Sequence, residues 1–247
     1  DGHSHIQAGL IPNCHSYDPT FNYELAVILQ HGMQEMYVEN KDKFYYVTVM
    51  NENYTHPEMP KGVEDDIIKG AYLFKKVAAK SKLSVNLLGS GTIFREVIAA
   101  AELLAKDFNI AANLIAAPSY NELYRDGLNV TRYNTLHPTT KPQKAFITSL
   151  LEKTGAQVSV SATDYIREYA GRIREFVPGR YLVLGTDGFG RSDYRVALRE
   201  FFEVNRFYIA VTALKGLADE GLIEAKVVAD AIKKYKIDIN KSNPWEV

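Results

Sequence analysis

The decisive stretch of the chain, residues 84–92, reads Ser84-Val85-Asn86-Leu87-Leu88-Gly89-Ser90-Gly91-Thr92. Its first five residues form a short apolar run typical of a buried strand, and the glycines that follow allow a tight turn. A segment rich in Ala, Leu and Glu comes next and predicts a helix over 92–106. A strand, a tight turn and a helix in this order favour parallel strands connected by helices.

The same alternation continues toward the C-terminus. We expect further strands at 112–117, 157–161 and 181–184, and helices near 121–125 and from 164 to about 175. Three more helices are expected at 194–202, 205–219 and 225–235. The chain therefore predicts an α/β fold with an open, mostly parallel sheet flanked by helices, in which ligands bind at the carboxyl ends of the strands.

The first 54 residues predict a smaller unit, a strand, a helix and a strand. The strands are expected at 13–17 and 44–50, and the helix follows the capping residue Asp18. Two strands are too few for an independent domain, so we expect other polypeptide to complete this sheet. Residues 55–62 have the composition of a linker, and 67–77 are expected to form an edge strand or an irregular lead-in.

Composition excludes several classes of function. The 247 residues are 46% hydrophobic and 24% charged with a net charge of −1, so no strong field points to nucleic acid or a membrane surface. No apolar run approaches the roughly 20 residues that span a bilayer. Cys14 is the single cysteine, which excludes an internal disulfide and is typical of a reducing compartment such as the cytoplasm.

The chain opens on a compact set of chemically capable residues, Asp1-Gly2-His3-Ser4-His5. Histidine titrates near neutrality, so His3 and His5 are candidates for acid/base work or for hydrogen bonds to a substrate. A metal site is the alternative, but no third ligand stands at a recognisable spacing, so none is expected. Because the sequence begins inside this motif, we expect the chain to be a piece of a longer protein.

Two glycine-rich stretches raise further alternatives. Gly89-Ser90-Gly91 after a strand is similar to a dinucleotide fingerprint and would suggest an NAD-binding oxidoreductase. Phe94 stands where the third glycine belongs and no acidic residue ends the next strand, which favours a plain tight turn. In the second stretch, 184–193, a local ion-pair set and a helix cap are expected within a structural or subunit-contact loop, from Asp187, Arg191, Ser192 and Asp193.

Three stretches together resemble the homodimeric bacterial pyruvate dehydrogenases, the thiamine-diphosphate-dependent first components of the pyruvate dehydrogenase complex. They are residues 1–7, 51–54 (Asn51-Glu52-Asn53-Tyr54) and 184–193 (Leu184-Gly185-Thr186-Asp187-Gly188-Phe189-Gly190-Arg191-Ser192-Asp193), and residues 225–232 agree with them. More distantly, Asp1-Gly2-x-x-His5 is similar to a transketolase motif. The resemblance implies three parts: the end of a pyrimidine-binding domain (1–55), a linker (56–82) and a transketolase-like C-terminal domain (83–247).

The resemblance also implies the roles of individual residues. His5 would contact the reacting centre as an acid/base or hydrogen-bond donor, with His3 beside it, and Asp1 and Asn51 would approach the substrate. The family's Gly-Asp-Gly signature for diphosphate and magnesium is absent here, as is its activating glutamate. We therefore expect no cofactor-binding or metal-binding residues in this chain, no binding of thiamine diphosphate or Mg²⁺ by the chain alone, and no activity without the rest of the enzyme.

Enzymes of this family decarboxylate pyruvate and transfer the two-carbon unit to a lipoyl group. The resemblance thus implies as partners the rest of the same enzyme, a second subunit of the homodimer and the lipoyl-bearing acetyltransferase component of the multienzyme complex. No nucleic acid or membrane partner is expected. The alternative is a non-catalytic dimerisation or binding module of a related 2-oxo acid dehydrogenase or transketolase.

Overall fold

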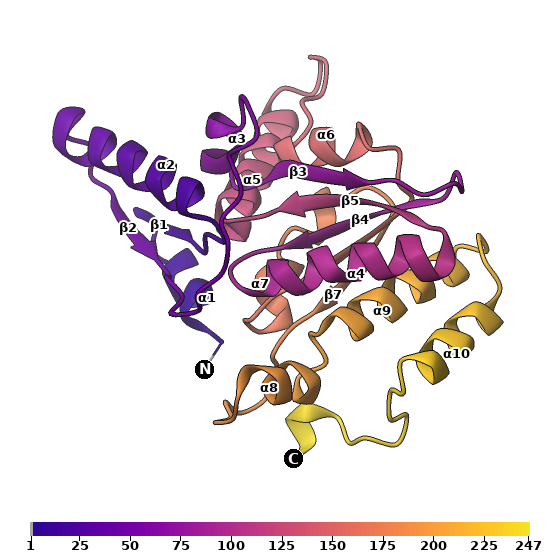
Figure 1. The fold of residues 1–247 in the computed structure, drawn as a ribbon. Coiled ribbons are helices and arrows are strands. Elements are labelled where there is room, and N and C mark those ends of the chain that lie inside the picture. The colour runs from indigo at the N-terminus through magenta and orange to yellow at the C-terminus, as the bar shows by residue number, and fades with distance from the viewer. Residues whose placement is uncertain (1) are drawn as a thin grey trace.

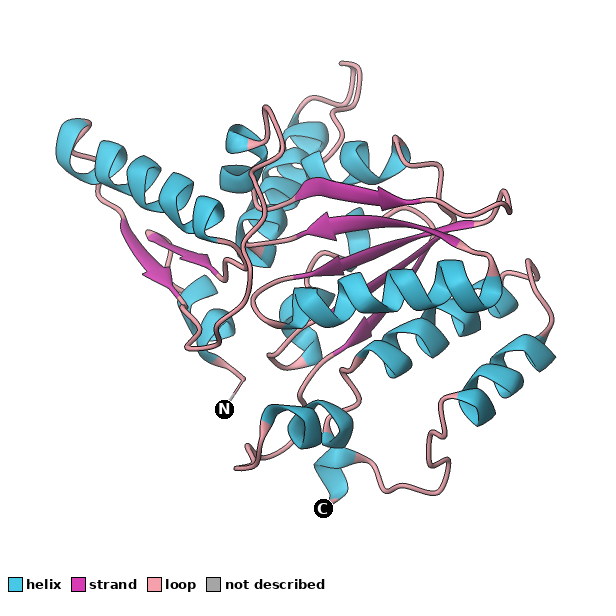
Figure 2. Ribbon diagram, viewed as in Figure 1, coloured by secondary structure: helices cyan, strands magenta, loops and turns pink. Residues whose placement is uncertain are grey.

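The computed structural model describes residues 2–247, and its centre is a five-stranded sheet in the order β3-β5-β4-β6-β7. Strands β5, β4, β6 and β7 run parallel to one another, and β3 lies antiparallel to β5 at one edge of the sheet. Figure 2 shows this sheet as a layer with helices on both sides. The strands are β3 (Tyr72–Val77), β4 (Ser84–Gly89), β5 (Ala111–Ala116), β6 (Val158–Ala162) and β7 (Arg180–Leu184). The predicted α/β fold is confirmed.

Each face of the sheet carries its own hydrophobic core. One core joins the sheet to α4 (Ile93–Phe108), α9 (Arg206–Asp219) and α10 (Ala225–Lys234), which lie in front of the sheet in Figure 1. The other joins it to α5 (Tyr120–Leu136), α6 (Phe146–Glu152) and α7 (Arg167–Gly171). Because side chains alternate along a strand, neighbours such as Leu87 and Leu88 enter opposite cores.

The N-terminal segment lies beside this sheet as a separate small layer (Figure 1). Its two strands, β1 (Cys14–Tyr17) and β2 (Phe44–Val47), pair in parallel, and α2 (Asn22–Met33) connects them through a turn of π-helix, η1 (Gln34–Val38). The strand–helix–strand prediction is confirmed. A short helix that was not predicted, α1 (Ser4–Gly9), precedes β1.

Other expectations were less accurate. The range 56–82, expected to be a linker, contains α3 (Glu64–Lys69) and β3, so it contributes to the main sheet; β3 is the edge strand that was expected within 67–77. The helix expected from 164 to about 175 is broken into α7 and a 3₁₀ turn, η2 (Arg174–Phe176). Near the C-terminus, α8 (Arg195–Phe201) and a second 3₁₀ turn, η3 (Pro244–Glu246), lie close together at the bottom of Figure 1.

Candidate functional site

A cavity of about 740 Å³ opens at the carboxyl ends of β4, β6 and β7. From β4 the chain continues to β5 on one side of the sheet and then crosses to β6 on the other. The crevice between β4 and β6 is therefore the switch point at which open α/β sheets usually bind ligands. Thr92, which follows β4, and Asp164, which follows β6, both line the cavity.

The first and third of the stretches that carry the family resemblance line this cavity, and the second, 51–54, begins one residue after Met50, which also lines it. Gly2 and Met50 line it together with Arg191 and Arg195 of the second glycine-rich loop and α8. Arg195 donates a hydrogen bond to the side-chain oxygen of Asn51 at 2.6 Å, which joins the second stretch to α8, the helix that follows the third. At Gly2, φ is +76°, and an added Cβ would lie 3.2 Å from the backbone nitrogen of Ile166, so glycine allows a close approach here.

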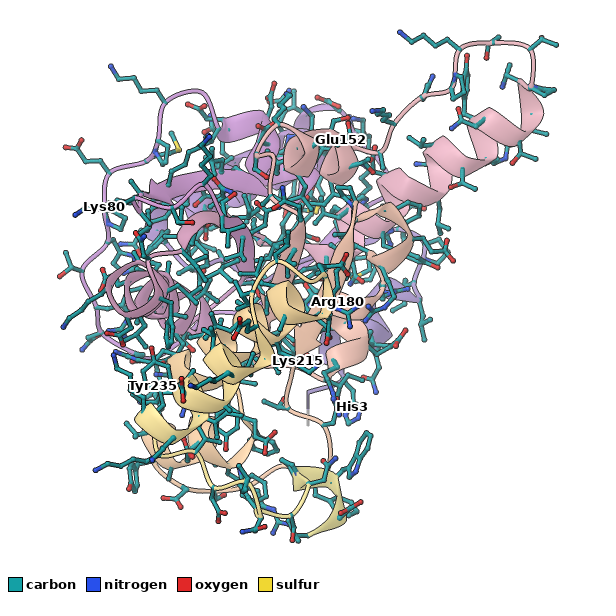
Figure 3. The ribbon with its side chains drawn as sticks, turned by 90° about the vertical axis from the view of Figure 1, so that its right-hand side faces the viewer. His3, Lys80, Glu152, Arg180, Lys215 and Tyr235 are labelled. Carbon is teal, nitrogen blue, oxygen red and sulfur yellow. The ribbon has the colours of Figure 1, made fainter. Side chains whose placement is uncertain are left out.

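The two histidines of the opening motif have different environments. His3 is exposed at the start of α1, where Figure 3 labels it, and His5 is completely buried one residue into that helix. Three aromatic rings surround His5: Tyr169 stacks on it at 4.8 Å between ring centroids, and Tyr46 and Tyr165 meet it edge-on. The two imidazoles therefore differ in their access to solvent and to a ligand.

A short chain of hydrogen bonds continues from His5. Its Nε2 lies 3.2 Å from the hydroxyl of Thr48, and that hydroxyl donates to Asp18 at 2.7 Å. The other ring nitrogen, Nδ1, is buried without a hydrogen-bond partner among residues 2–247. Burial disfavours the charged imidazolium and lowers the pKa of His5 from 6.5 to about 4, so the ring is neutral at physiological pH.

Asp18 explains the first glycine-rich turn. Its carboxylate is completely buried and accepts hydrogen bonds from the hydroxyls of Thr48, Ser90 and Tyr165. Gly91 has φ +50°, and a Cβ there would lie 2.6 Å from the Asp18 carboxylate. The turn at the start of α4 thus packs against the side chain of Asp18, which belongs to the N-terminal segment. This contradicts the dinucleotide alternative and confirms the structural turn.

The second glycine-rich loop does not form the local ion-pair set that we expected. Asp187 accepts instead from the backbone and guanidinium of Arg167, and Arg191 donates to the carbonyl of Val247. The cap expected at Ser192 or Asp193 does not form: α8 begins after Tyr194 without a side-chain cap, and Asp193 accepts only from the backbone nitrogen of Tyr194, the next residue, at 2.8 Å. The loop is consequently held by α7 and by the C-terminus, two elements far away in the sequence.

A charged network beside Asn51 was missed by the sequence analysis. Glu52 forms ion pairs with Arg95 of α4 and with Arg195 and Arg199 of α8. Glu96, one residue after Arg95, pairs with Arg199 and Arg206. These partners are more than 40 residues from Glu52 in the chain, so no local spacing could reveal them.

Two further expectations concern Asp1 and metal ions. Asp1 lies outside the described residues. Within residues 2–247, no group of three His, Cys, Asp or Glu side chains is arranged to hold a metal ion. The helices of that range include none that is long and apolar enough to cross a membrane.

The C-terminal part of the chain has a recognisable family. Residues 70–205, more than half of the chain, match the model of the transketolase-like C-terminal domain. The chain belongs to this transketolase-like family. Residues 1–57 match a second model, the middle domain of the pyruvate dehydrogenase E1 component. The two matches fall on the N-terminal segment and on the main sheet of the transketolase-like fold.

Curated relatives agree with both matches. The chain is 57% identical to the pyruvate dehydrogenase E1 component of Cupriavidus necator over its whole length, and 48% identical to that of Escherichia coli over 99% of its length. It spans 28% and 27% of those two proteins.

Solved structures share the transketolase-like fold at much lower identity. Transketolase from Campylobacter jejuni covers 86% of this chain with a TM-score of 0.61 and 18% identity, and the match covers 28% of that transketolase. Transketolase from Leishmania mexicana covers 88% with a TM-score of 0.58 and 16% identity, over 27% of its own chain.

Proposed function

We propose that this chain belongs to the thiamine-diphosphate-dependent first component of a cytoplasmic pyruvate dehydrogenase complex. That enzyme would decarboxylate pyruvate and transfer the acetyl unit to the lipoyl group of an acetyltransferase component. The observation that carries the proposal is a cavity lined by two of the family stretches, with Asn51 of the remaining stretch bonded to its lining residue Arg195, in a chain 57% identical throughout to a pyruvate dehydrogenase E1 component. A second subunit of the same enzyme is the other expected partner.

The residues present do not fit thiamine diphosphate and its Mg²⁺ by themselves. Mg²⁺ on a diphosphate takes oxygen ligands in near-octahedral geometry, usually including carboxylates. No metal-binding group of three side chains exists in residues 2–247, and the family signature for the diphosphate is absent from the sequence. We therefore propose that the chain alone neither binds the cofactor nor releases carbon dioxide from pyruvate.

We propose different roles for the two histidines. His3 is exposed and can reach a reacting group that other polypeptide presents, so it is the better candidate for direct contact. His5 is neutral, enclosed and hydrogen-bonded, which suits a group that orients its neighbours or accepts one hydrogen bond. Asn51, held by Arg195, keeps its proposed position near the substrate.

The test compares the chain with the complete enzyme that contains it. Titration calorimetry with thiamine diphosphate and Mg²⁺ should detect no binding to the 247-residue chain, and pyruvate-dependent carbon dioxide release should occur only with the complete enzyme. In the complete enzyme, His3→Ala should lower turnover at least about a hundredfold, the usual scale of a positioned acid/base group, and Asn51→Ala at least about tenfold. Turnover by the chain alone would refute the proposal.

The alternative function, a dimerisation or binding module, is favoured by one surface. The second glycine-rich loop and α8 expose large apolar side chains, with Phe189 83%, Tyr194 69% and Val196 70% exposed. No residue of α8 is buried. Such a surface is typical of a protein–protein interface. Sedimentation velocity of the chain and of a Tyr194→Ser variant decides whether this surface joins two copies, since only the original chain should then dimerise.

A further inference from the structure

Asp18 belongs to the N-terminal segment, but its hydrogen bonds connect that segment to the transketolase-like sheet. This side chain stands between β1 and α2, and all of its hydroxyl partners come from elsewhere: Thr48 follows β2, Ser90 precedes α4 and Tyr165 follows β6. The backbone is joined at the same place, because the nitrogen of Gly91 donates to the carbonyl of Asp18. A single buried carboxylate therefore connects the switch point of the sheet to the opening motif.

The direction of these hydrogen bonds follows from charge. The carboxylate lies against Ser90 and Gly91, just before the N-terminus of the 16-residue helix α4, where the helix dipole favours an anion. Burial raises the pKa of Asp18, and the hydrogen bonds from Thr48, Ser90 and Tyr165 oppose that increase because they stabilise the ionised form. The Thr48 hydroxyl donates to Asp18 at 2.7 Å, while the carbonyl of Tyr17, a second acceptor, lies farther away at 3.4 Å, so the hydroxyl proton points at Asp18.

The orientation of Thr48 then determines the state of His5. A hydroxyl that gives its only proton to Asp18 can offer His5 nothing but a lone pair. The Nε2 of His5, at 3.2 Å, must therefore carry the ring proton, and Nδ1 is left as an acceptor. That acceptor is buried and has no partner among residues 2–247, which is costly and is characteristic of functional sites.

The plane of the ring is fixed separately. Tyr169 stacks on His5, and Tyr165 meets it edge-on at 4.6 Å between centroids. Tyr165 also donates to Asp18 at 3.4 Å, so one side chain contacts both ends of the chain of hydrogen bonds. Packing holds the ring in place, and the Thr48–Asp18 pair selects which of its nitrogens is protonated.

We propose that Asp18 and Thr48 are positioning residues that hold His5 as its Nε2-protonated tautomer, with the Nδ1 lone pair available as a hydrogen-bond acceptor. The transketolase-like sheet contributes Ser90 and Tyr165 to this relay, which gives it a part in the site beyond architecture. The consequence for turnover rests on the proposed function of the complete enzyme. The tautomer itself does not, and it can be measured in this chain.

The experiment is ¹⁵N NMR of the histidine side chains in the 247-residue chain, with His5→Phe used to assign the His5 signals. In the original chain, Nε2 should be protonated and Nδ1 should show the shift of a bare ring nitrogen. Thr48→Ser, which keeps the hydroxyl, should retain this pattern. Thr48→Val, which keeps the shape and removes the hydroxyl, should lose it. The matched control Ser90→Ala removes another hydroxyl from Asp18 and should retain the tautomer.

A protonated Nδ1 in the original chain, or an unchanged tautomer in Thr48→Val, would overturn the relay. In the complete enzyme, Thr48→Val should lower turnover at least about tenfold and Thr48→Ser should restore most of it, because a wrongly held tautomer is costly in catalysis. If the tautomer changes and turnover does not, the relay stands and the proposed role of His5 in the enzyme fails. The two failures are thus distinguishable.

Discussion

At the scale of single residues, a substitution at Gly91 tests how closely the turn packs against the Asp18 carboxylate. The left-handed backbone at φ +50° costs any other residue about 1–3 kcal/mol, and a Cβ 2.6 Å from a buried carboxylate adds overpacking. We expect Gly91→Ala to lower the free energy of unfolding by about 2–4 kcal/mol, measured by urea denaturation.

Gly62 provides the matched control for this prediction. Its φ is +74°, yet a Cβ there would meet nothing within 4 Å. Gly62→Ala should therefore cost only the backbone part, about 1 kcal/mol. Equal losses for the two variants would mean that the contact with Asp18 contributes nothing.

A second residue-scale prediction concerns pH. Glu24 is completely buried, and burial raises its pKa from 4.5 to about 7, although hydrogen bonds from Tyr72, Phe21 and Thr20 oppose the increase. The stability that the protonated group contributes is fully present below about pH 4.5 and is lost as the pH rises through about 7.

Glu24→Gln is neutral at every pH, so it isolates this dependence. Between pH 4.5 and 7, its free energy of unfolding should fall by about 3 kcal/mol less than that of the original chain, which corresponds to one proton over the shifted range. Denaturation curves at several pH values provide the comparison. Parallel pH profiles for the two proteins would show that the carboxyl titrates normally.

At the scale of elements, periodic apolar residues were the reliable signal. Helix α9 was expected at 205–219 and occupies Arg206–Asp219 because one side of it packs into the core. Helix α5 was expected only near 121–125 but continues to Leu136. Its second half stands away from the core (the pink helix at the upper right of Figure 3) and lacks an apolar face, so no periodicity marks it. Hydroxyls such as Thr131 bond the preceding turn instead.

The start of α9 gives a prediction at this scale. The side-chain oxygen of Asn205 accepts from the backbone nitrogens of Phe207 and Tyr208 at 3.0 and 3.2 Å, a helix cap. We expect Asn205→Ala to cost about 1 kcal/mol in the free energy of unfolding, and Asn205→Ser to recover most of that loss, since serine caps equally well. Chemical denaturation of the three proteins measures both effects, and a serine variant as unstable as the alanine variant would argue against capping.

At the scale of the whole molecule, the sequence predicted which stretches matter but not how they join. The opening motif, Asn51 and the second glycine-rich loop were recognised from their residues; the structure places the motif and the loop on one cavity and bonds Asn51 to Arg195 in its lining. The relay from His5 to Asp18 was not predicted, because its hydrogen-bonded pairs stand up to 147 positions apart and carry no spacing signal. Asp18 was interpreted only as a helix cap, and this was wrong: Phe21 precedes the first residue of α2, and Asp18 is buried among partners from other elements.

The contacts at the junction between the N-terminal segment and the main sheet support the last prediction. A two-stranded sheet is marginal alone, so the N-terminal segment depends on its contacts with the main sheet. Asn121 of α5 donates to the carbonyl of His5 at 2.7 Å and to the hydroxyl of Ser16 at 2.6 Å, and it is almost completely buried. Removing a buried partner of this kind costs about 1–3 kcal/mol, so Asn121→Ala should speed amide exchange in α1 and β1 by about ten- to a hundredfold.

Hydrogen exchange read by mass spectrometry separates this local effect from a general loss of stability. In Asn121→Ala, peptides from α1 and β1 should exchange faster while peptides from the inner strands β4 and β6 change little. Asn205→Ala, a cap on the opposite core, should leave α1 and β1 at their original rates. Faster exchange throughout the chain in Asn121→Ala would mean that the segment and the sheet open as one cooperative unit, and that Asn121 stabilises the whole molecule rather than the junction.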